Sequence, residues 1–398
     1  MENNNSGRRK LIAIAAAVGI FAAGYGTATL STRMDYGNVP ASTIKNLNKI
    51  EKLIEKNYYT DYDKDALYRY AEEFMVYGLE DPYSYYLDEK SIEEYDEDIT
   101  GNYVGIGVTL TPGDNGEIKI LAPFEGSPAL DAGIKANDIL HKVDGKEYMY
   151  DNVDEAVSKI RGKSGDKVNL EIIRGAETLS FEVEKREIEV ASVTSKKLES
   201  NIIYLKVSRF DITTADDLKK ELEKYQVNDK TGIVLDLRDN PGGVVISALE
   251  IADMFISEGI LLTEKYKNAD DVVTDSTKDA LNIKYPVVIL ANKYSASASE
   301  ILTGALKDNG VAVLVGETTY GKGILNQKFN IDDKSSLVLS IGEYTTPSGE
   351  SIHEKGITPD YEVLLPENLQ LKLSSDLTSE EDIQLKKAVE LITRGDIK

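Results

Sequence analysis

Three serines in one short segment are the first candidates for chemistry. Residues 292–300 read Asn-Lys-Tyr-Ser-Ala-Ser-Ala-Ser-Glu and join a buried strand pattern at 287–291 to a helix pattern at 297–308. A sharp turn from strand to helix exposes a side chain and directs free helical N–H groups towards developing negative charge. An N-cap accounts for one serine but hardly for the alternating set. The segment therefore predicts a serine nucleophile.

A lysine between two glycines is the second candidate. Lys322 lies between Gly321 and Gly323, and a P-loop is excluded because that motif requires Ser or Thr after its lysine. A solvated lysine, with a pKa of about 10.4, is roughly three units from neutrality at pH 7. Burial lowers the pKa and makes lysine a possible general base. The alternative is an ordinary surface charge.

A third segment, Asn240-Pro241-Gly242-Gly243, follows another buried strand pattern at 232–237. Free amides of a Gly-Gly pair suit an oxyanion hole, although the same residues also make a simple tight turn. The two histidines, His141 and His353, have no neighbouring Asp or nucleophile-elbow pattern. A Ser–His–Asp triad is not expected, and a serine hydrolase here needs another base, such as lysine.

Composition excludes several classes of protein. The chain has 398 residues, enough for two or three domains. Its 46 basic and 69 acidic residues give a net charge of −23, which argues against nucleic-acid binding. The absence of Cys excludes a thiolate nucleophile, a thiolate metal site and disulfides, and two His make a multi-His metal site improbable. We expect no metal and no organic cofactor.

The N-terminus predicts a single membrane anchor. The basic tail at 1–10 precedes an uncharged run whose 20 residues, at about 1.5 Å each, span roughly a bilayer core. We expect a transmembrane helix at 11–31 in the cell membrane. The basic flank keeps the tail in the cytoplasm and places the catalytic part outside. A cleaved signal peptide is the alternative, although its apolar region is usually shorter, about 7–15 residues.

The predicted secondary structure and composition of the remaining chain change at three points. Apolar residues at three- and four-residue steps predict a helical region at 41–98. Short strands and turns follow at 99–186, and alternating strands and helices at 187–366 predict a layered α/β domain. Residues 367–398 form a polar C-terminal extension.

Residues 99–186 resemble a PDZ domain of the bacterial protease-associated type. The resemblance rests on the glycine-containing loop at 103–108, the Gly-Ser-Pro-Ala turn at 126–129, the Gly-Ile-x-x-x-Asp-Ile-Leu segment at 133–140 and the helix pattern at 153–160.

That loop is the candidate peptide-binding site. Gly105 and Gly107 let backbone N–H donors converge on a chain-terminal carboxylate. The strand after them can pair with an extended peptide, and the helix at 153–160 forms the other wall. Ile106 and Val108 favour an apolar terminal side chain. The alternative is that these glycines serve only a hairpin.

Taken in order, the motifs resemble those of the carboxyl-terminal processing peptidases, or tail-specific proteases, which are Ser/Lys serine proteases with a PDZ domain. The resemblance covers about 41–366 and rests on residues 235–243, 295–301, 319–323, 346–349 and 356–360. It implies a multidomain α+β architecture with an N-terminal transmembrane helix, a helical arm, a PDZ-like β-rich domain and an α/β layered protease domain.

The resemblance also assigns roles. It implies that Ser297 is the nucleophile and that Lys322, 25 positions later, is the base. The N–H groups of Ala298 and of Gly243, or of Gly242, would form the oxyanion hole.

One position departs from the family pattern. The family commonly has Gln four positions after the lysine, where it orients the base, whereas this chain has Asn326 followed by Gln327. The Asn side chain is one methylene shorter, so the orienting role is open between these two residues.

We therefore expect a membrane-anchored serine endopeptidase that cleaves proteins selected by their free C-terminal tails. A catalytically weak or inactive PDZ adaptor is the first alternative, motivated by Asn326. A non-peptidase hydrolytic or acyl-transfer enzyme of related topology is the second. Family resemblance alone adds the expectation of a homodimer formed through 41–98 and the C-terminal extension.

Overall fold

The computed structural model describes residues 39–113, 115–124, 126–225, 231–277, 286–370 and 372–397. The chain divides into two compact units at the boundary between residues 69 and 70. The expected cytoplasmic tail at 1–10 and membrane anchor at 11–31 lie outside the described residues. Among the residues that are described, no helix has the length and apolar character needed to cross a membrane.

The first unit contains α2 (Ala41–Asn57) and the beginning of α3 (Lys64–Tyr77). Glu51 joins the two helices because it accepts a hydrogen bond from the Tyr68 hydroxyl at 2.7 Å and pairs with Lys64 at 2.6 Å. The apolar stripe of α2 that the sequence predicts is present but exposed: Ile44 and Leu53 are 41% and 52% accessible.

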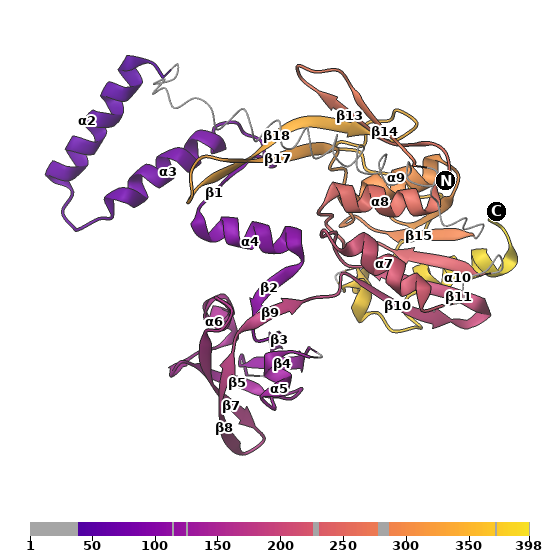
Figure 1. Ribbon diagram of the computed structural model, residues 1–398, viewed down its shortest axis with the longest axis horizontal. Coiled ribbons are helices and arrows are strands. Elements are labelled where there is room, and N and C mark those ends of the chain that lie inside the picture. Colours follow the sequence, from indigo (N-terminus) through magenta and orange to yellow (C-terminus); the bar gives the residue numbers. More distant parts are fainter. Residues whose placement is uncertain are drawn as a thin grey trace, which may run out of the picture. The chain divides into compact units, whose positions relative to one another are not determined.

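A β-rich domain follows α4 (Glu89–Thr100) in the second unit (Figure 1). Its main sheet has the order β3-β4-β5-β7-β8, with β6 beside β5, while β2 pairs with β9 separately. Strand β4 and its neighbours bury Ile118, Ile120 and Leu140 completely. The bounds are β2 (Asn102–Gly105), β3 (Val108–Pro112), β4 (Ile118–Pro123), α5 (Pro128–Asp131), β5 (Ile139–Val143), β6 (Lys146–Glu147), α6 (Val153–Ile160), β7 (Lys167–Arg174), β8 (Glu177–Glu184) and β9 (Arg186–Glu189).

The α/β domain is built on a six-stranded sheet of order β10-β11-β12-β15-β16-β19, in which only the β10–β11 pair is antiparallel. Strands β12 and β15 are buried along their whole length, which explains their continuous apolar sequence. The bounds are β10 (Val193–Leu198), β11 (Ile202–Val207), α7 (Thr214–Glu223), β12 (Gly232–Asp236), α8 (Val245–Phe255), β15 (Val287–Ala291), α9 (Ala298–Asp308), β16 (Ala312–Gly316), β19 (Tyr361–Glu362) and α10 (Ile383–Arg394).

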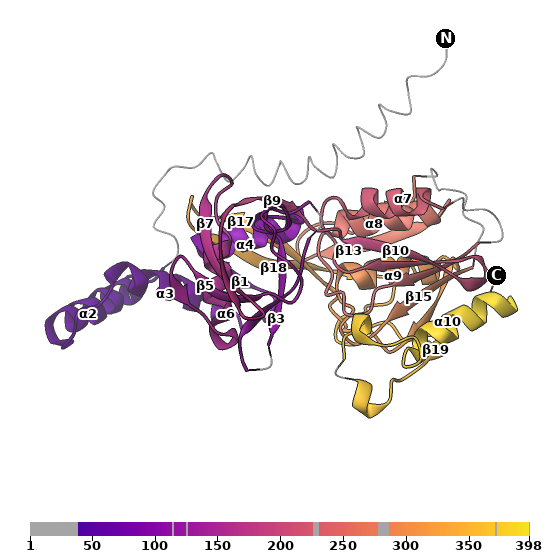
Figure 2. The same ribbon diagram turned by 90° about the horizontal axis from the view of Figure 1, so that it is seen from below.

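Helices cover both faces of this sheet. One hydrophobic core contains residues of α7, α8 and α9, and a second core places Ala388 and Leu391 of α10 against strand residues such as Val234. Figure 2 shows α7 and α8 on one side of the sheet and α10 on the other. The expected C-terminal extension is therefore part of the α/β domain. Short 3₁₀ turns lie at Tyr150–Asn152, Glu199–Asn201, Glu367–Leu369 and Ser374–Asp376.

A second sheet of the same domain has the order β1-β18-β13-β14, with β17 beside β18. Strand β1 pairs with β18 although the whole β-rich domain separates them in sequence, with Tyr85 opposite Val338. Residues 85–87, assigned from sequence to the helical region, thus belong by pairing to the α/β domain. The bounds are β1 (Tyr85–Leu87), β13 (Ile260–Tyr266), β14 (Val272–Asp275), β17 (Ile324–Asn330) and β18 (Ser336–Thr345).

A buried ionic network ties α10 to the end of β12. Arg238 is 1% exposed, and its guanidinium donates to Asp236 at 2.7 Å, to Asp382 at 2.8 and 2.9 Å, and to Gln384 at 3.0 Å. Burial opposes ionisation of Asp236, but the charge of Arg238 outweighs it and holds the pKa of that carboxyl below its usual range. Two carboxylates balance the charges of Arg238 and Lys206, so removal of Asp382 leaves both cations facing Asp236 alone and one positive charge uncompensated.

We predict that Asp382→Ala lowers the free energy of unfolding by about 3–5 kcal/mol, because Arg238 loses a bidentate partner in the interior. The matched control is Asp376→Ala, an exposed position in the same extension, with an expected change within about 0.5 kcal/mol. Urea unfolding of the three proteins measures the difference. Equal stabilities of the two variants would show that the network does not hold α10.

Candidate active site

Ser297 lies at the turn between β15 and α9. Its backbone has φ +53° and ψ −116°, a conformation that non-glycine residues rarely adopt and that strand-to-helix nucleophile turns use. The residue is half-buried, whereas Ser295 and Ser299 on either side are completely buried.

The flanking serines explain the alternating sequence. The Ser295 hydroxyl donates to the Leu237 carbonyl at 2.8 Å, and the Ser299 hydroxyl donates to the Asn240 carbonyl at 2.9 Å. Both bonds fasten the nucleophile turn to the segment that follows β12. The outer two serines are therefore structural, and the middle one is the accessible hydroxyl.

The glycine pair packs directly against this turn. A Cβ atom on Gly242 would lie 2.6 Å from the Ala296 carbonyl oxygen and 2.8 Å from the Ser297 Cβ. A Cβ on Gly243 would lie 2.0 Å from the Phe210 carbonyl oxygen. Both residues also have positive φ, +104° and +134°, so the close approach and the backbone conformation both require glycine.

The two glycines differ as oxyanion donors. The Gly242 N–H already donates to the Asn240 side chain at 2.9 Å. Within the described ranges, the N–H groups of Gly243 and Ala298 have no hydrogen-bond acceptor. Since Ala298 is the first residue of α9, its N–H is one of those that a helix leaves free. The geometry thus favours Gly243 over Gly242 as the partner of Ala298.

Lys322 is half-buried on the loop before β17. Burial lowers its pKa, while the negative charges of Asp81 and Glu300 act in the opposite direction. Its Nζ lies 5.0 Å from the centroid of the Tyr83 ring. Asp81 and Tyr83 are not among the site residues that the sequence predicts.

Two buried side chains connect the segments of Ser297 and Lys322. One oxygen of the Glu300 carboxylate accepts from the backbone N–H groups of both Ser297 and Lys322, each at 2.9 Å. The other accepts from the Gly321 N–H at 2.7 Å and from the Thr319 hydroxyl at 2.6 Å. Glu300 could have been noticed in the sequence, because Ser-x-x-Glu at a helix start is a capping pattern.

The second connection is Tyr344 of β18. Its hydroxyl oxygen lies 3.2 Å from the Ser297 carbonyl oxygen and also within hydrogen-bond distance of the Lys322 carbonyl, so its single proton is shared between these two acceptors. Burial raises the pKa of Tyr344 well above its usual value, so it remains a donor. No local sequence signal pointed to this residue, because only the tertiary fold brings β18 beneath the turn.

Within the described part of the chain, neither candidate for orienting the base forms a hydrogen bond with Lys322. The Asn326 side-chain amide donates to the Tyr83 carbonyl at 2.8 Å and lies 3.4 Å from the Ser340 hydroxyl. Gln327 is the next residue of β17, and its side chain points to the opposite face of that strand. The structure therefore links Asn326 to Lys322 through Tyr83.

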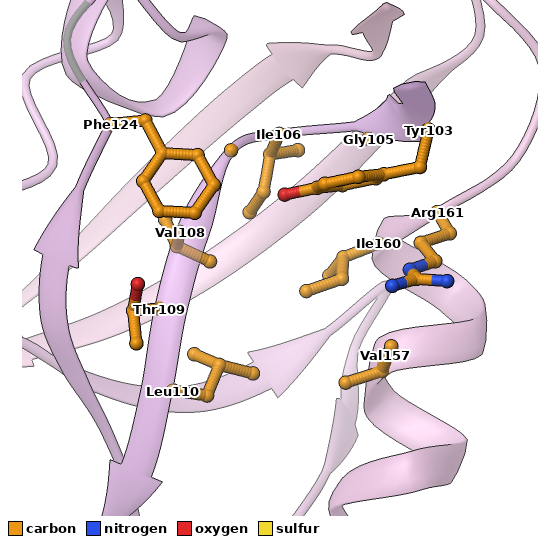
Figure 3. A pocket seen from close by; sticks show the side chains of 11 residues that line it. Tyr103, Gly105, Ile106, Val108, Thr109, Leu110, Phe124, Val157, Ile160 and Arg161 are labelled. Carbon is orange, nitrogen blue, oxygen red and sulfur yellow. The ribbon is translucent and has the colours of Figure 1, made fainter. Parts of the chain in front are cut away.

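The β-rich domain holds a separate groove with a volume of about 330 Å³. Figure 3 shows Val108 and Leu110 of β3 facing Val157 and Ile160 of α6 across it. All four predicted peptide-binding residues line the groove, together with Tyr103, Thr109, Phe124 and Arg161. Its walls are thus mainly apolar.

One end of the groove offers backbone donors. The N–H groups of Ile106 and Gly107 have no acceptor within the described part of the chain. Gly107 has φ +72°, and a Cβ there would lie 2.5 Å from the Ser127 Cβ. Arg161 lies at the rim, where it pairs with Glu97 at 2.9 Å and stacks on the Tyr103 ring at 4.7 Å.

Metal ligation has no obvious place in this arrangement. In the described portion of the chain, no group of three or more His, Cys, Asp or Glu residues is arranged to hold an ion.

Comparison with known proteins identifies the family of this chain. Residues 201–363 match the model of peptidase family S41, residues 104–184 match that of the PDZ domain, and residues 23–91 match that of the activating protease CtpB N-terminal domain. The carboxy-terminal processing protease CtpA of Bacillus subtilis (strain 168) is 37% identical over 340 residues, which cover 85% of this chain and 72% of that protein. The chain belongs to the carboxy-terminal processing proteases of peptidase family S41.

Two further comparisons support the same family and fold. The "Probable CtpA-like serine protease" of Staphylococcus aureus (strain N315) is 37% identical over 335 residues, or 82% of this chain and 67% of that protein. The crystal structure of an S41-assigned protein from Bacteroides fragilis NCTC 9343 is 19% identical, with a TM-score of 0.53 over 86% of this chain and 93% of that one, and shows the same fold. The predicted family, the PDZ domain and the serine-type peptidase class are confirmed.

We predict different effects for the three serines. Ser297→Ala abolishes peptide hydrolysis and leaves stability almost unchanged, because its hydroxyl is the accessible one. Ser299→Ala instead lowers the free energy of unfolding by about 0.5–1.5 kcal/mol, because the buried Asn240 carbonyl loses one of its two donors and keeps the Ala296 N–H. Hydrolysis assays and urea unfolding separate these effects. Full activity of Ser297→Ala would contradict the assignment.

Proposed function

We propose that this protein is a membrane-anchored endopeptidase in which Ser297 and Lys322 form the catalytic dyad. The observation that carries the proposal is the shared support of these residues: Glu300 and Tyr344 each bond to the backbone of both. A half-buried lysine with a lowered pKa, fastened to an accessible serine, is what a Ser/Lys mechanism requires.

The proposed reaction has two halves. Neutral Lys322 takes the proton from the Ser297 hydroxyl, and the alkoxide attacks the carbonyl carbon of the scissile peptide. The N–H groups of Ala298 and Gly243 stabilise the tetrahedral oxyanion. Lys322 then gives its proton to the leaving amine. Water attacks the acyl-enzyme, Lys322 accepts the water proton, and the proton returns to the serine oxygen.

The pH dependence follows from the role of the amine. Only deprotonated Lys322 acts as a base, so activity rises as pH increases through its pKa. Burial lowers that pKa, and this shifts the rise towards neutral pH compared with a solvated lysine.

Substrate selection is proposed to lie in the PDZ groove. A chain-terminal carboxylate would be bound by the free N–H groups of Ile106 and Gly107, and the preceding residues would add a strand beside β3. The apolar walls favour an apolar terminal side chain. The expected anchor at 11–31, with the catalytic part outside the cell membrane, belongs to the same proposal and rests on the uncharged N-terminal run.

The dyad is tested by mass spectrometry of the products formed from an unfolded protein with an apolar C-terminus. We predict that the wild-type chain yields fragments and that neither Ser297→Ala nor Lys322→Met does, because each variant lacks one half of the dyad. Binding of the tail without any cleavage by the wild type would instead support the PDZ adaptor. Cleavage by Lys322→Met would contradict lysine as the base.

The groove is tested with a charge on α6. Val157→Glu is predicted to raise KM for a tailed substrate about tenfold, since a carboxylate in an apolar groove opposes binding of an anionic, apolar chain end. The control is Ser158→Glu, the adjacent exposed position on the same helix. Cleavage of a short peptide without a free tail should be equal in both variants. An unchanged KM in Val157→Glu would contradict tail binding at this groove.

A further inference from the structure

Residues 81–84 lie far from the nucleophile in sequence but beside the lysine in the fold. The segment follows α3 and leads into β1, which pairs with β18. The Ser340 N–H of β18 donates to the Ser84 hydroxyl at 2.9 Å. That hydroxyl in turn donates to the Asp81 carboxylate at 2.6 Å, which also accepts from the Tyr83 N–H at 3.0 Å. The segment is therefore fastened to the same sheet that carries β17.

Tyr83 contacts the base side of the site through both its ring and its backbone. Its ring centroid lies 5.0 Å from Lys322 Nζ, and its carbonyl accepts the Asn326 amide at 2.8 Å. A lysine has a long flexible stem, so a flat aromatic face beside the terminal nitrogen restricts where that nitrogen can go. Asn326 holds the peptide that carries this ring.

We propose that Asp81 and Tyr83 are positioning residues for the general base: the ring of Tyr83 restricts the Lys322 amine beside it, and the carboxylate of Asp81, which accepts from the Tyr83 N–H, holds the segment that carries this ring. The inference rests on Lys322 being the base. It accounts for the departure at position 326, because the shorter Asn side chain acts on the lysine through Tyr83.

The effect of the Asp81 charge on the pKa of Lys322 has a definite direction. Burial works against ionisation of Asp81, but hydrogen bonds from Ser340, Ser84 and Tyr83 lower its pKa, so it is negative at neutral pH. A negative charge near an ammonium stabilises the charged form and raises the pKa of Lys322. Removal of the Asp81 charge must therefore shift the acid limb of the pH–activity profile, where activity rises as Lys322 loses its proton, to lower pH.

Other polar and titratable groups surround the lysine, and the test must separate them. Glu300 of α9 adds a second negative charge, and Tyr344 of β18 is buried nearby. Tyr320 lies beside Tyr83, and the His353 ring meets the Tyr83 ring edge-on at 6.0 Å between centroids. His353 is included in the test because its imidazole lies next to the Tyr83 ring.

The experiment is a pH profile of kcat/KM for the full chain on a peptide substrate. Asp81→Asn is expected to move the acid limb about 0.5–1 pH unit lower, and Asp81→Glu, which restores the charge, should return it towards the wild-type position. His353→Gln should leave the limb in place. The proposal would be overturned if the pH at which kcat/KM rises were the same in Asp81→Asn and the wild type. It would also be overturned if this rise disappeared in His353→Gln.

The ring is tested by Tyr83→Leu, for which we expect kcat to fall about tenfold with little change in KM, because the amine is less well placed. Tyr83→Phe keeps the ring and should lose much less. The matched control is Tyr85→Leu, an exposed tyrosine two residues along the chain, with no expected change in kcat. Equal kcat values for the Leu and Phe variants at position 83 would contradict a role of the ring.

Two further measurements separate failure of this inference from failure of the proposed function. NMR titration of ε-carbon-labelled lysine in Asp81→Asn and wild type compares the Lys322 pKa without any assay of activity, and thermal unfolding confirms that the variants are folded. If Lys322→Met retains activity, the dyad itself is wrong. If Lys322→Met is inactive while the variants at 81 and 83 behave as wild type, only the positioning role is wrong.

Discussion

The site depends on one buried carboxylate. Glu300 accepts hydrogen bonds from the backbones of Ser297, Gly321 and Lys322 and from the Thr319 hydroxyl. A carboxylate is suited to this position because it is purely an acceptor, with two oxygens that can each take more than one donor. It makes the turn of α9 and the loop before β17 a single unit, although these segments are separate in sequence. The strained backbone of Ser297 is tolerated because its N–H and its carbonyl are both held from outside.

The oxyanion side of the site is supported from two directions. Ser295 and Ser299 attach the nucleophile turn to Leu237 and Asn240. Behind that segment, Asp382 of the C-terminal extension completes the buried network of Arg238. Asp239, with φ +63°, is held by Asn292 and by the Ser374 N–H. Residues near the C-terminus, Ser374 and Asp382, thus support the segment that follows β12.

Local sequence patterns predicted much of this domain. The continuous apolar runs at 232–237 and 287–291 are buried strands, and the helix pattern after the serine repeat is α9. The choice of Ser297 among the serines came from family resemblance, and burial now supplies a physical reason for it. Gly243 could not be separated from Gly242 by sequence, because the difference is a single hydrogen bond from Gly242 to Asn240.

Other contributions could not be predicted, because they depend on pairing between distant segments. Tyr83 reaches Lys322 only because β1 pairs with β18 across the intervening PDZ domain. Tyr344 reaches the segments of Ser297 and Lys322 because β18 pairs with β17, the strand that follows the Lys322 loop. Asn326 could be noticed as a departure from the family pattern, but its partner, the Tyr83 carbonyl, is visible only in the fold.

The most direct test of the account is the rate of the first chemical step when Glu300 loses its charge. Glu300→Gln keeps the shape but places an NH₂ group against N–H donors, so the turn and the loop should separate. We predict that single-turnover acylation of Ser297 slows by at least about 10²-fold with substrate affinity largely retained, since small misplacement of reacting groups has costs of that order. An acylation rate equal to that of the wild type, in a folded variant, would contradict the claim that this carboxylate holds nucleophile and base together.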